Sequence, residues 1–152
     1  MYFNMDDWSK EIIEARDVRY LPVLYFPCLD KAGYTVTETV TDGRKMAEVM
    51  ASIIKRYPTI IAAMTGMDLS VDSEAFGAEV KFADRAVPSV KAAIVHDMAE
   101  AEALKVPDMN AGRIQVFVDA VKEAQKLITD RPIFGGQLGP FSLTANLLEL
   151  SA

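Results

Sequence analysis

Polar side chains follow two apolar segments at places where a parallel sheet would bind a ligand. Asp68 comes after the apolar run at residues 60–64, and the turn Gln137-Leu138-Gly139-Pro140 follows a second run at residues 133–136. Parallel α/β folds bind ligands at the carboxyl ends of their strands, so both positions would open on one face and line one pocket. Asp68 then has two interpretations: a ligand-facing carboxylate, or the cap of a short helix over residues 70–75.

Other reactive side chains carry weaker signals. Asp72 and Glu74 are typical of a solvated helix start that the helix dipole favours, and their spacing matches no metal motif, so we predict no metal site. Cys28 follows Pro27 at the end of an expected strand, and it either faces the pocket or is a buried, inert thiol. His96 has no second His or Cys nearby in the sequence, which favours a surface or capping role.

The glycines at positions 135, 136 and 139 do not form a phosphate-binding loop. No Gly-Lys-Ser/Thr follows them, and their spacing is not Gly-x-Gly-x-x-Gly. Close backbone approach inside a crowded barrel explains them better.

The composition is that of a globular protein that binds neither nucleic acid nor membrane. Of 152 residues, 51% are hydrophobic and 25% are charged, and the net charge is −6, whereas phosphate binding needs clustered Lys and Arg. The longest apolar runs are too short to cross a bilayer, and an acidic pair, Asp6 and Asp7, stands where a signal peptide carries positive charge. We expect a cytoplasmic protein without an internal disulfide, because Cys28 is the single cysteine.

Hydrophobic patterning in the first half predicts two helices and two strands. One helix spans residues 7–15, and a much longer amphipathic helix runs from Met46 to Tyr57, with Thr41 or Asp42 as its cap and Pro58 as its end. Strands are expected over residues 18–26 and 59–64. Pro22 indicates that the first of these lies at an edge or begins the sheet.

The second half predicts a hairpin, two helices, a strand and a last helix. The hairpin would join residues 80–82 to 90–94 by a turn near residues 84–88. Helices are expected over residues 97–104 and 114–128, the second with Asn110 as its cap, then a strand over 133–138 and a helix over 142–150. The order indicates an α/β fold with parallel strands, either part of a barrel or a doubly wound open sheet, in a single domain over residues 1–152.

Two of these segments resemble the uroporphyrinogen decarboxylase family. The first combines Arg-Tyr-Pro-Thr-Ile-Ile-Ala-Ala (56–63), Met-Asp-Leu-Ser-Val (67–71) and Glu-Ala-Phe-Gly-Ala-Glu-Val (74–80). The second combines Asp-Arg-Pro-Ile-Phe-Gly-Gly (130–136) with Gly-Pro-Phe-Ser-Leu (139–143). The resemblance implies the N-terminal portion of a (β/α)8 TIM barrel with a small β-hairpin excursion, covering less than half of a typical member.

The resemblance also implies a site. In the decarboxylases of the family, an Asp at the position of Asp68 hydrogen-bonds pyrrole N–H groups and would stabilise positive charge on the macrocycle, so Asp68 is the expected catalytic residue. Gln137, Gly139, Pro140, Phe141 and Cys28 are the expected tetrapyrrole-binding residues. A tetrapyrrole or corrinoid is therefore the expected ligand.

The family also contains corrinoid methyltransferases, which move a methyl group between a cobamide and a thiol such as coenzyme M with a zinc-bound thiolate. Decarboxylases carry an arginine-rich loop after the first strand, but residues 26–34 contain no arginine and only Lys31. The methyltransferase branch is therefore the closer likeness, with a cobamide as cofactor. Alternatives are a uroporphyrinogen decarboxylase of porphyrin biosynthesis and a non-catalytic tetrapyrrole-binding or assembly module.

The zinc ligands of the methyltransferases lie in the C-terminal half of the family, beyond the residues matched here. Zinc is thus expected only with such a half, and this chain alone is expected to be inactive. Three parallel strands would leave open sheet edges and an apolar face. We therefore expect a homo-oligomer or a complementary C-terminal chain as partner.

Overall fold

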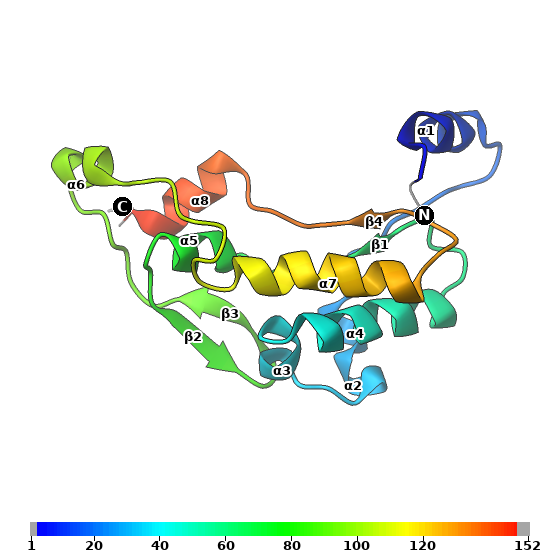
Figure 1. Cartoon of the computed structure of the whole chain (residues 1–152), viewed down its shortest axis with the longest axis horizontal. Coiled ribbons are helices and arrows are strands. Elements are labelled where there is room, and N and C mark those ends of the chain that lie inside the picture. The colour runs from blue at the N-terminus through cyan, green and yellow to red at the C-terminus, as the bar shows by residue number, and fades with distance from the viewer. Residues whose placement is uncertain (1–2, 149–152) are drawn as a thin grey trace.

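The structure is a computed structural model that describes residues 3–148. Figure 1 shows two long helices lying side by side, with a short strand pair along one side and smaller elements at both ends. In chain order the elements are α1 Met5–Glu14, a 3-10 helix at Phe26–Cys28, α2 Leu29–Ala32, α3 Val36–Val40, α4 Gly43–Arg56, β1 Ala63–Met64, α5 Val71–Ala75, β2 Val80–Ala83, β3 Ala86–Val90, α6 Met98–Ala103, α7 Ile114–Leu127, β4 Ile133–Phe134 and α8 Pro140–Leu147.

The parallel sheet consists of β1 and β4, which pair Ala63 with Ile133 and Met64 with Phe134. The backbone N–H of Thr65 continues the pairing by donating to the carbonyl of Phe134 at 3.1 Å. The chain between these strands contains α7, so the unit is a strand–helix–strand crossover, as parallel pairing requires. The prediction of an α/β fold with parallel strands is confirmed, whereas the described strands do not close a barrel.

Helix α4 begins and ends where its sequence predicts. The Asp42 side chain caps its first turn by accepting from the N–H groups of Arg44 and Lys45, and Pro58 follows the last turn. The long apolar stripe faces inward, and Met46 and Val49 are completely buried. The first residue of α4, Gly43, lies directly against α7, and a Cβ atom there would lie 2.6 Å from the carbonyl oxygen of Val116. The missing side chain therefore allows the two backbones to touch.

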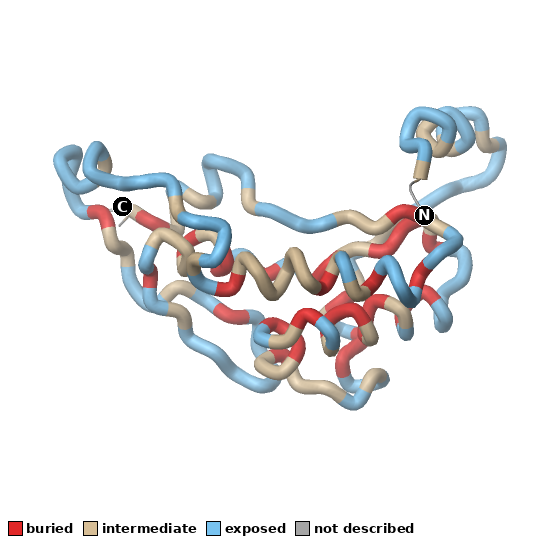
Figure 2. Tube along the Cα trace, in the orientation of Figure 1, coloured by how far each residue is buried: buried red, intermediate tan, exposed pale blue. Residues whose placement is uncertain are grey.

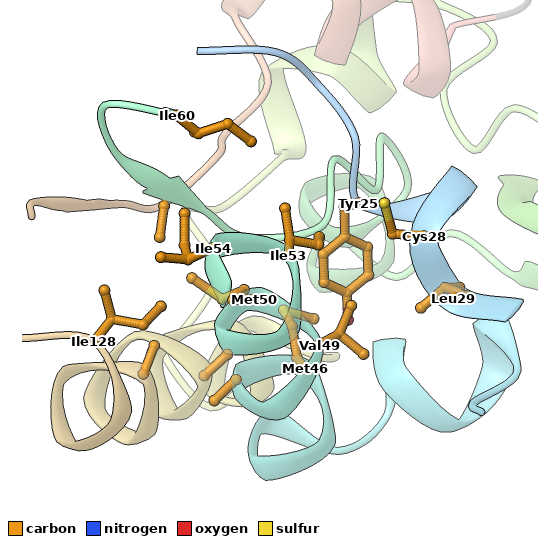
Figure 3. Close-up of a cluster of buried hydrophobic side chains, with 14 of the residues drawn as sticks. Tyr25, Cys28, Leu29, Met46, Val49, Met50, Ile53, Ile54, Ile60 and Ile128 are labelled. Atoms are coloured by element: carbon orange, nitrogen blue, oxygen red, sulfur yellow. The ribbon is translucent and has the colours of Figure 1, made fainter. Parts of the chain in front are cut away.

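The hydrophobic core lies around α4. Figure 3 shows Tyr25, Cys28 and Leu29 on one side of this helix and Ile128 on the other. Figure 2 shows that buried residues are concentrated along α4 and the neighbouring segments, whereas α6 and residues 135–141 are largely exposed. At the other end, α1 has no buried residue, and it meets the body through an edge-on ring contact between Trp8 and Phe134 at 5.9 Å.

The strands are shorter than the sequence predicts. The strand predicted over residues 18–26 is wrong, because this segment forms no strand ladder, although the carbonyl of Tyr20 accepts from the N–H of Ile61 at 3.3 Å. Pro22 has no N–H to donate, and Phe26 already begins a 3-10 helix. Of the runs 59–64 and 133–138, only two residues each are paired.

The excursion between β1 and α7 matches most of its prediction. The hairpin β2–β3 is antiparallel and turns at residues 84–85, and the Asp97 side chain caps α6 by accepting from Glu100 N–H. The predicted cap of α7 is wrong, because Asn110 donates to Asp108 instead and α7 starts at Ile114 without a side-chain cap.

Helix α8 starts two residues earlier than predicted, with Gly139 as its N-cap and Pro140 in its first turn, a position that proline favours. The end of the helix predicted over 142–150 lies outside the described residues. Within residues 3–148, no helix is long and apolar enough to span a membrane.

Candidate functional site

The Asp68 carboxylate lies in a buried ionic network just past β1. One oxygen accepts from the backbone N–H of Ser70 at 2.9 Å and from the Ser70 hydroxyl at 2.6 Å. The other oxygen accepts from the guanidinium of Arg113 at 2.5 Å. The side chain of Asp68 is completely buried and that of Arg113 is 8% exposed. The carboxylate is therefore ion-paired, and both of its oxygens accept hydrogen bonds, at the start of the turn into α5.

Arg113 joins four separate segments of the chain. Besides Asp68, its guanidinium donates to the Glu74 carboxylate at 2.6 Å, to the Ser70 hydroxyl at 2.9 Å and to the carbonyl of Val40 at 3.3 Å. It also lies over the ring of Phe82 in the hairpin, 4.8 Å from the ring centroid. A planar group with five donors suits such a junction.

The sequence-based interpretation missed Arg113, although one signal was available. Arg113 immediately precedes α7, and a cation at a helix N-terminus opposes the helix dipole. The buried carboxylate of Asp68 offsets this unfavourable interaction by pairing with the guanidinium. The preceding Gly112 has φ +53°, and a Cβ there would lie 3.1 Å from the backbone N of Ala75. Glycine thus allows the chain to bring Arg113 against α5.

The sequence suggested that Asp72 and Glu74 belong to a solvated helix start, but both carboxylates make contacts outside α5. Glu74 forms the second ion pair of Arg113. Asp72 accepts from the backbone N–H of Leu138 at 3.2 Å, across the gap between the two connections that follow β1 and β4. Both carboxylates therefore connect α5 to other parts of the chain.

A groove of about 360 Å³ runs between α7 and the segment that follows β4. Its walls are mainly apolar, and its polar lining comes from the connections that follow β1 and β4. It is lined by Asp68, Val71, Asp72, Met109, Ile114, Phe117, Val118, Val121, Gly135, Gly136 and Gln137. None of these described lining residues is a lysine or an arginine. The groove thus combines an apolar wall with acidic and amide groups.

The structure brings together two of the predicted site residues, the expected catalytic Asp68 and the expected tetrapyrrole-binding Gln137. Asp68 and Gln137 both line the groove, although the completely buried Asp68 side chain leaves only its backbone accessible. Gly139 and Pro140 begin α8 outside the groove lining, and Phe141 is 87% exposed. Cys28 lies in the hydrophobic core, away from these residues, which corresponds to the inert-thiol alternative.

The described residues offer no set of metal ligands. Within residues 3–148, no group of three His, Cys, Asp or Glu side chains is placed to hold a metal ion. His96 is exposed just before α6, and its backbone N–H donates to the Glu100 carboxylate at 2.7 Å.

Comparisons with known proteins identify the family. The family model described as uroporphyrinogen decarboxylase (URO-D) matches residues 15–151. Two similar proteins are the methylcobamide:CoM methyltransferases MtbA of Methanosarcina acetivorans, 33% identical over 106 residues, and of Methanosarcina mazei, 30% identical over 106 residues. Each alignment covers 66% of this chain and 31% of the relative.

A solved methyltransferase from Methanosarcina mazei has the same fold, with a TM-score of 0.81 at 23% identity over 98% of this chain and 46% of that chain. This chain therefore spans less than half of the proteins it resembles. Because the family model covers nearly all of its residues, the chain belongs to the uroporphyrinogen decarboxylase family.

Proposed function

We propose that the chain is part of a corrinoid-dependent methyltransferase, which moves a methyl group between a cobamide and a thiol such as coenzyme M. In this proposal it forms one domain, a portion of a (β/α)8 barrel, whose groove beside α7 contacts the tetrapyrrole. The observation that carries the proposal is the lining of the groove, which consists of apolar residues with Asp72 and Gln137 and contains no cationic side chain among the described lining residues.

The same lining argues against uroporphyrinogen, the substrate of the decarboxylases, because that molecule carries eight carboxylates. Recognition of carboxylates needs Arg or Lys, and the guanidinium of Arg113 is already engaged by Asp68 and Glu74. Residues 26–34, where the decarboxylases carry arginines, form a 3-10 helix and a short α-helix with Cys28 and Leu29 buried. An octacarboxylate would thus meet repulsion from Asp72 without compensation.

The groove fits part of a cobamide. Its volume of about 360 Å³ is at the lower end of the range for small-molecule sites, ~300–1,000 Å³, so it would hold one edge of the macrocycle. Phe117, Val118 and Val121 would contact the ring edge, and Gln137 would hydrogen-bond a peripheral amide. A bound cobamide would supply the cobalt that carries the methyl group. The described residues of this chain would bind and orient it.

No step through zinc follows from these residues, since the described part of the chain holds no cluster of ligands. The buried, fully engaged carboxylate of Asp68 favours a second candidate, a tetrapyrrole-binding module without catalysis of its own. For Asp68 to act on a pyrrole N–H, as the family resemblance implies, Arg113 would have to release it. The action of Asp68 on a pyrrole N–H remains a prediction. So do the cytoplasmic location and the association with a second copy or a complementary chain.

Calorimetric titration of the purified chain with methylcobalamin and, separately, with uroporphyrin tests the proposal. We expect methylcobalamin to bind and the octacarboxylate uroporphyrin not to bind. Val121→Gln, which places an amide on the apolar wall, should weaken methylcobalamin binding about fivefold, because roughly 1 kcal/mol of apolar contact is lost. Leu127→Gln is the matched control on the same helix, since Leu127 is outside the groove lining and 53% exposed.

Two outcomes would contradict the proposal. Tighter binding of uroporphyrin than of methylcobalamin would favour the decarboxylase branch. Equal effects of Val121→Gln and Leu127→Gln on methylcobalamin affinity would show that the ligand does not bind in this groove.

A further inference from the structure

The parallel pairing of β1 with β4 stops early because β1 leaves the sheet. After Thr65 the chain turns at Gly66, whose carbonyl accepts from the N–H of Asp68 at 3.2 Å. The Gly66 backbone lies against the ring of Tyr25, where a Cβ would come within 2.9 Å of Cδ1. The backbone of this strand therefore has no further residues in position to pair with the chain beyond Phe134.

Side chains continue the pairing where the backbone stops. The N–H of Gly136 donates to the Thr65 hydroxyl at 2.9 Å, and the N–H of Leu138 donates to the Asp72 carboxylate at 3.2 Å. Residues 136 and 138 are alternate positions, the spacing at which an extended chain directs its N–H groups to the same side. The two side chains thus take the place of the ladder acceptors that a longer β1 would provide.

The segment held in this way would otherwise be loosely constrained. Residues 135 and 136 are glycines, and a third glycine follows the segment at position 139; glycines lose the most conformational freedom on ordering. Residues 135–137 are also exposed, so apolar burial contributes little to fixing them. Gln137, which lines the groove, lies between the two residues whose N–H groups are held. The position of that wall therefore depends on Thr65 and Asp72.

We propose that Thr65 and Asp72 are positioning residues, which hold residues 135–138 extended and so set the place of Gln137 at the groove. This rests on the proposed function only for the identity of the ligand. Asp72 acts here through an acceptor oxygen and not through its charge. Asparagine keeps such an oxygen and removes the charge, so the two roles can be separated.

Amide hydrogen exchange of the full chain, followed by NMR, tests the contacts directly. Asp72→Ala should speed exchange at Leu138 N–H about fivefold to tenfold, the factor expected for the loss of one ordinary hydrogen bond of about 1 kcal/mol. Asp72→Asn should leave that rate within about twofold of the original. Thr65→Val and Thr65→Ser form the corresponding pair for Gly136 N–H, because valine is similar in shape to threonine but lacks the hydroxyl.

Methylcobalamin affinity of the same variants gives the second measurement. Asp72→Ala and Thr65→Val should weaken binding, and Asp72→Asn and Thr65→Ser should restore it. Unchanged exchange at Leu138 in Asp72→Ala would overturn the proposal, as would Asp72→Asn being as damaging as Asp72→Ala. If the unaltered chain does not bind methylcobalamin, the proposed function fails, while the exchange rates still decide whether Thr65 and Asp72 hold the segment.

Discussion

Two regions around the strand pair are held together by different kinds of interaction: the helical layer beside the strands, and the connections at their carboxyl ends. In the helical layer, α4 and α7 touch along their length, and Met46, Ala47, Val49 and Ala120 are completely buried. At the carboxyl ends, the connections after β1 and β4 are fixed by polar contacts of a few side chains, those of Thr65, Asp72 and Arg113. Apolar packing thus forms the supporting layer, and directional hydrogen bonds shape the region that carries the groove.

This difference indicates how each region should respond to substitution. Apolar contacts are numerous and individually weak, so damage to the helical layer is spread over many neighbours. A buried charge has few partners, and the loss of one leaves another uncompensated. The carboxyl-end region should therefore depend more strongly on single residues, above all on Arg113.

Arg113→Ala should have the largest effect. It leaves the carboxylate of Asp68 buried without its counter-ion, which costs about 3–5 kcal/mol, a large part of the ~5–15 kcal/mol that stabilises an ordinary domain. Urea unfolding, followed by circular dichroism, measures the change. Arg113→Lys keeps the charge and should fall between Arg113→Ala and the original chain, which provides a folded variant if Arg113→Ala does not fold.

The matched control for this change is Arg44→Ala. Arg44 forms an ion pair with Glu48 one turn away on α4, and its side chain is 80% exposed, so the expected loss is about 0.5 kcal/mol or less. If the two alanine variants were equally stable, the buried network would not hold the carboxyl-end region together.

Gly43→Ala should have an intermediate effect, confined to the helical layer. A Cβ at this position would lie 2.6 Å from the carbonyl oxygen of Val116 and 2.8 Å from the backbone N of Ala120. Both atoms belong to the α7 backbone, so the helices must separate, at a cost of about 1–3 kcal/mol. The unfolding free energy measures it.

Gly139→Ala is the control for Gly43→Ala. Gly139 has φ −74° and no neighbouring atom within 4 Å of an added Cβ, so its replacement should change stability by less than ~0.5 kcal/mol. A Gly43→Ala variant as stable as Gly139→Ala would show that α4 and α7 do not approach as closely as described.

The helices could be predicted from the sequence, whereas the strands could be predicted only in part. The signals for a helix such as α4 lie within its own segment: Asp42 as the cap, and apolar residues that recur with the helical period of about 3.6 residues. Strand pairing depends on a neighbour that the sequence does not specify. The apolar run over residues 59–64 begins in a turn, because the N–H of Ile60 bonds the carbonyl of Tyr57, and only Ala63 and Met64 reach the partner strand.

The position of the candidate groove could be predicted from the sequence, but the contacts made by its residues could not. The rule that ligands bind at strand carboxyl ends placed Asp68 and Gln137 near one groove. It could not reveal that Arg113, 45 residues after Asp68, forms an ion pair with the carboxylate. An ion pair between residues far apart in the chain produces no periodic pattern in the sequence. Phe141 was grouped with them through a sequence motif, yet its side chain points into solvent, 87% exposed.

The smallest effect should come from the surface of the helical layer, at Glu38 of α3. The ammonium group of Lys45, at 2.8 Å, and the backbone N–H of Thr35 lower the pKa of this carboxyl from 4.5 to about 2.

A carboxyl whose pKa is lower in the folded state than in the unfolded state adds stability above the unfolded pKa, and this contribution disappears as the pH falls from about 4.5 towards 2. Because the side chain is 42% exposed, solvent and salt screen the pair. Glu38→Gln should therefore lower the urea midpoint slightly at pH 7, where the contribution is fully present, and flatten its pH dependence slightly between pH 4.5 and 2. A loss at pH 7 as large as that of Gly43→Ala would mean that this exposed pair, and not apolar packing, determines the stability of the layer.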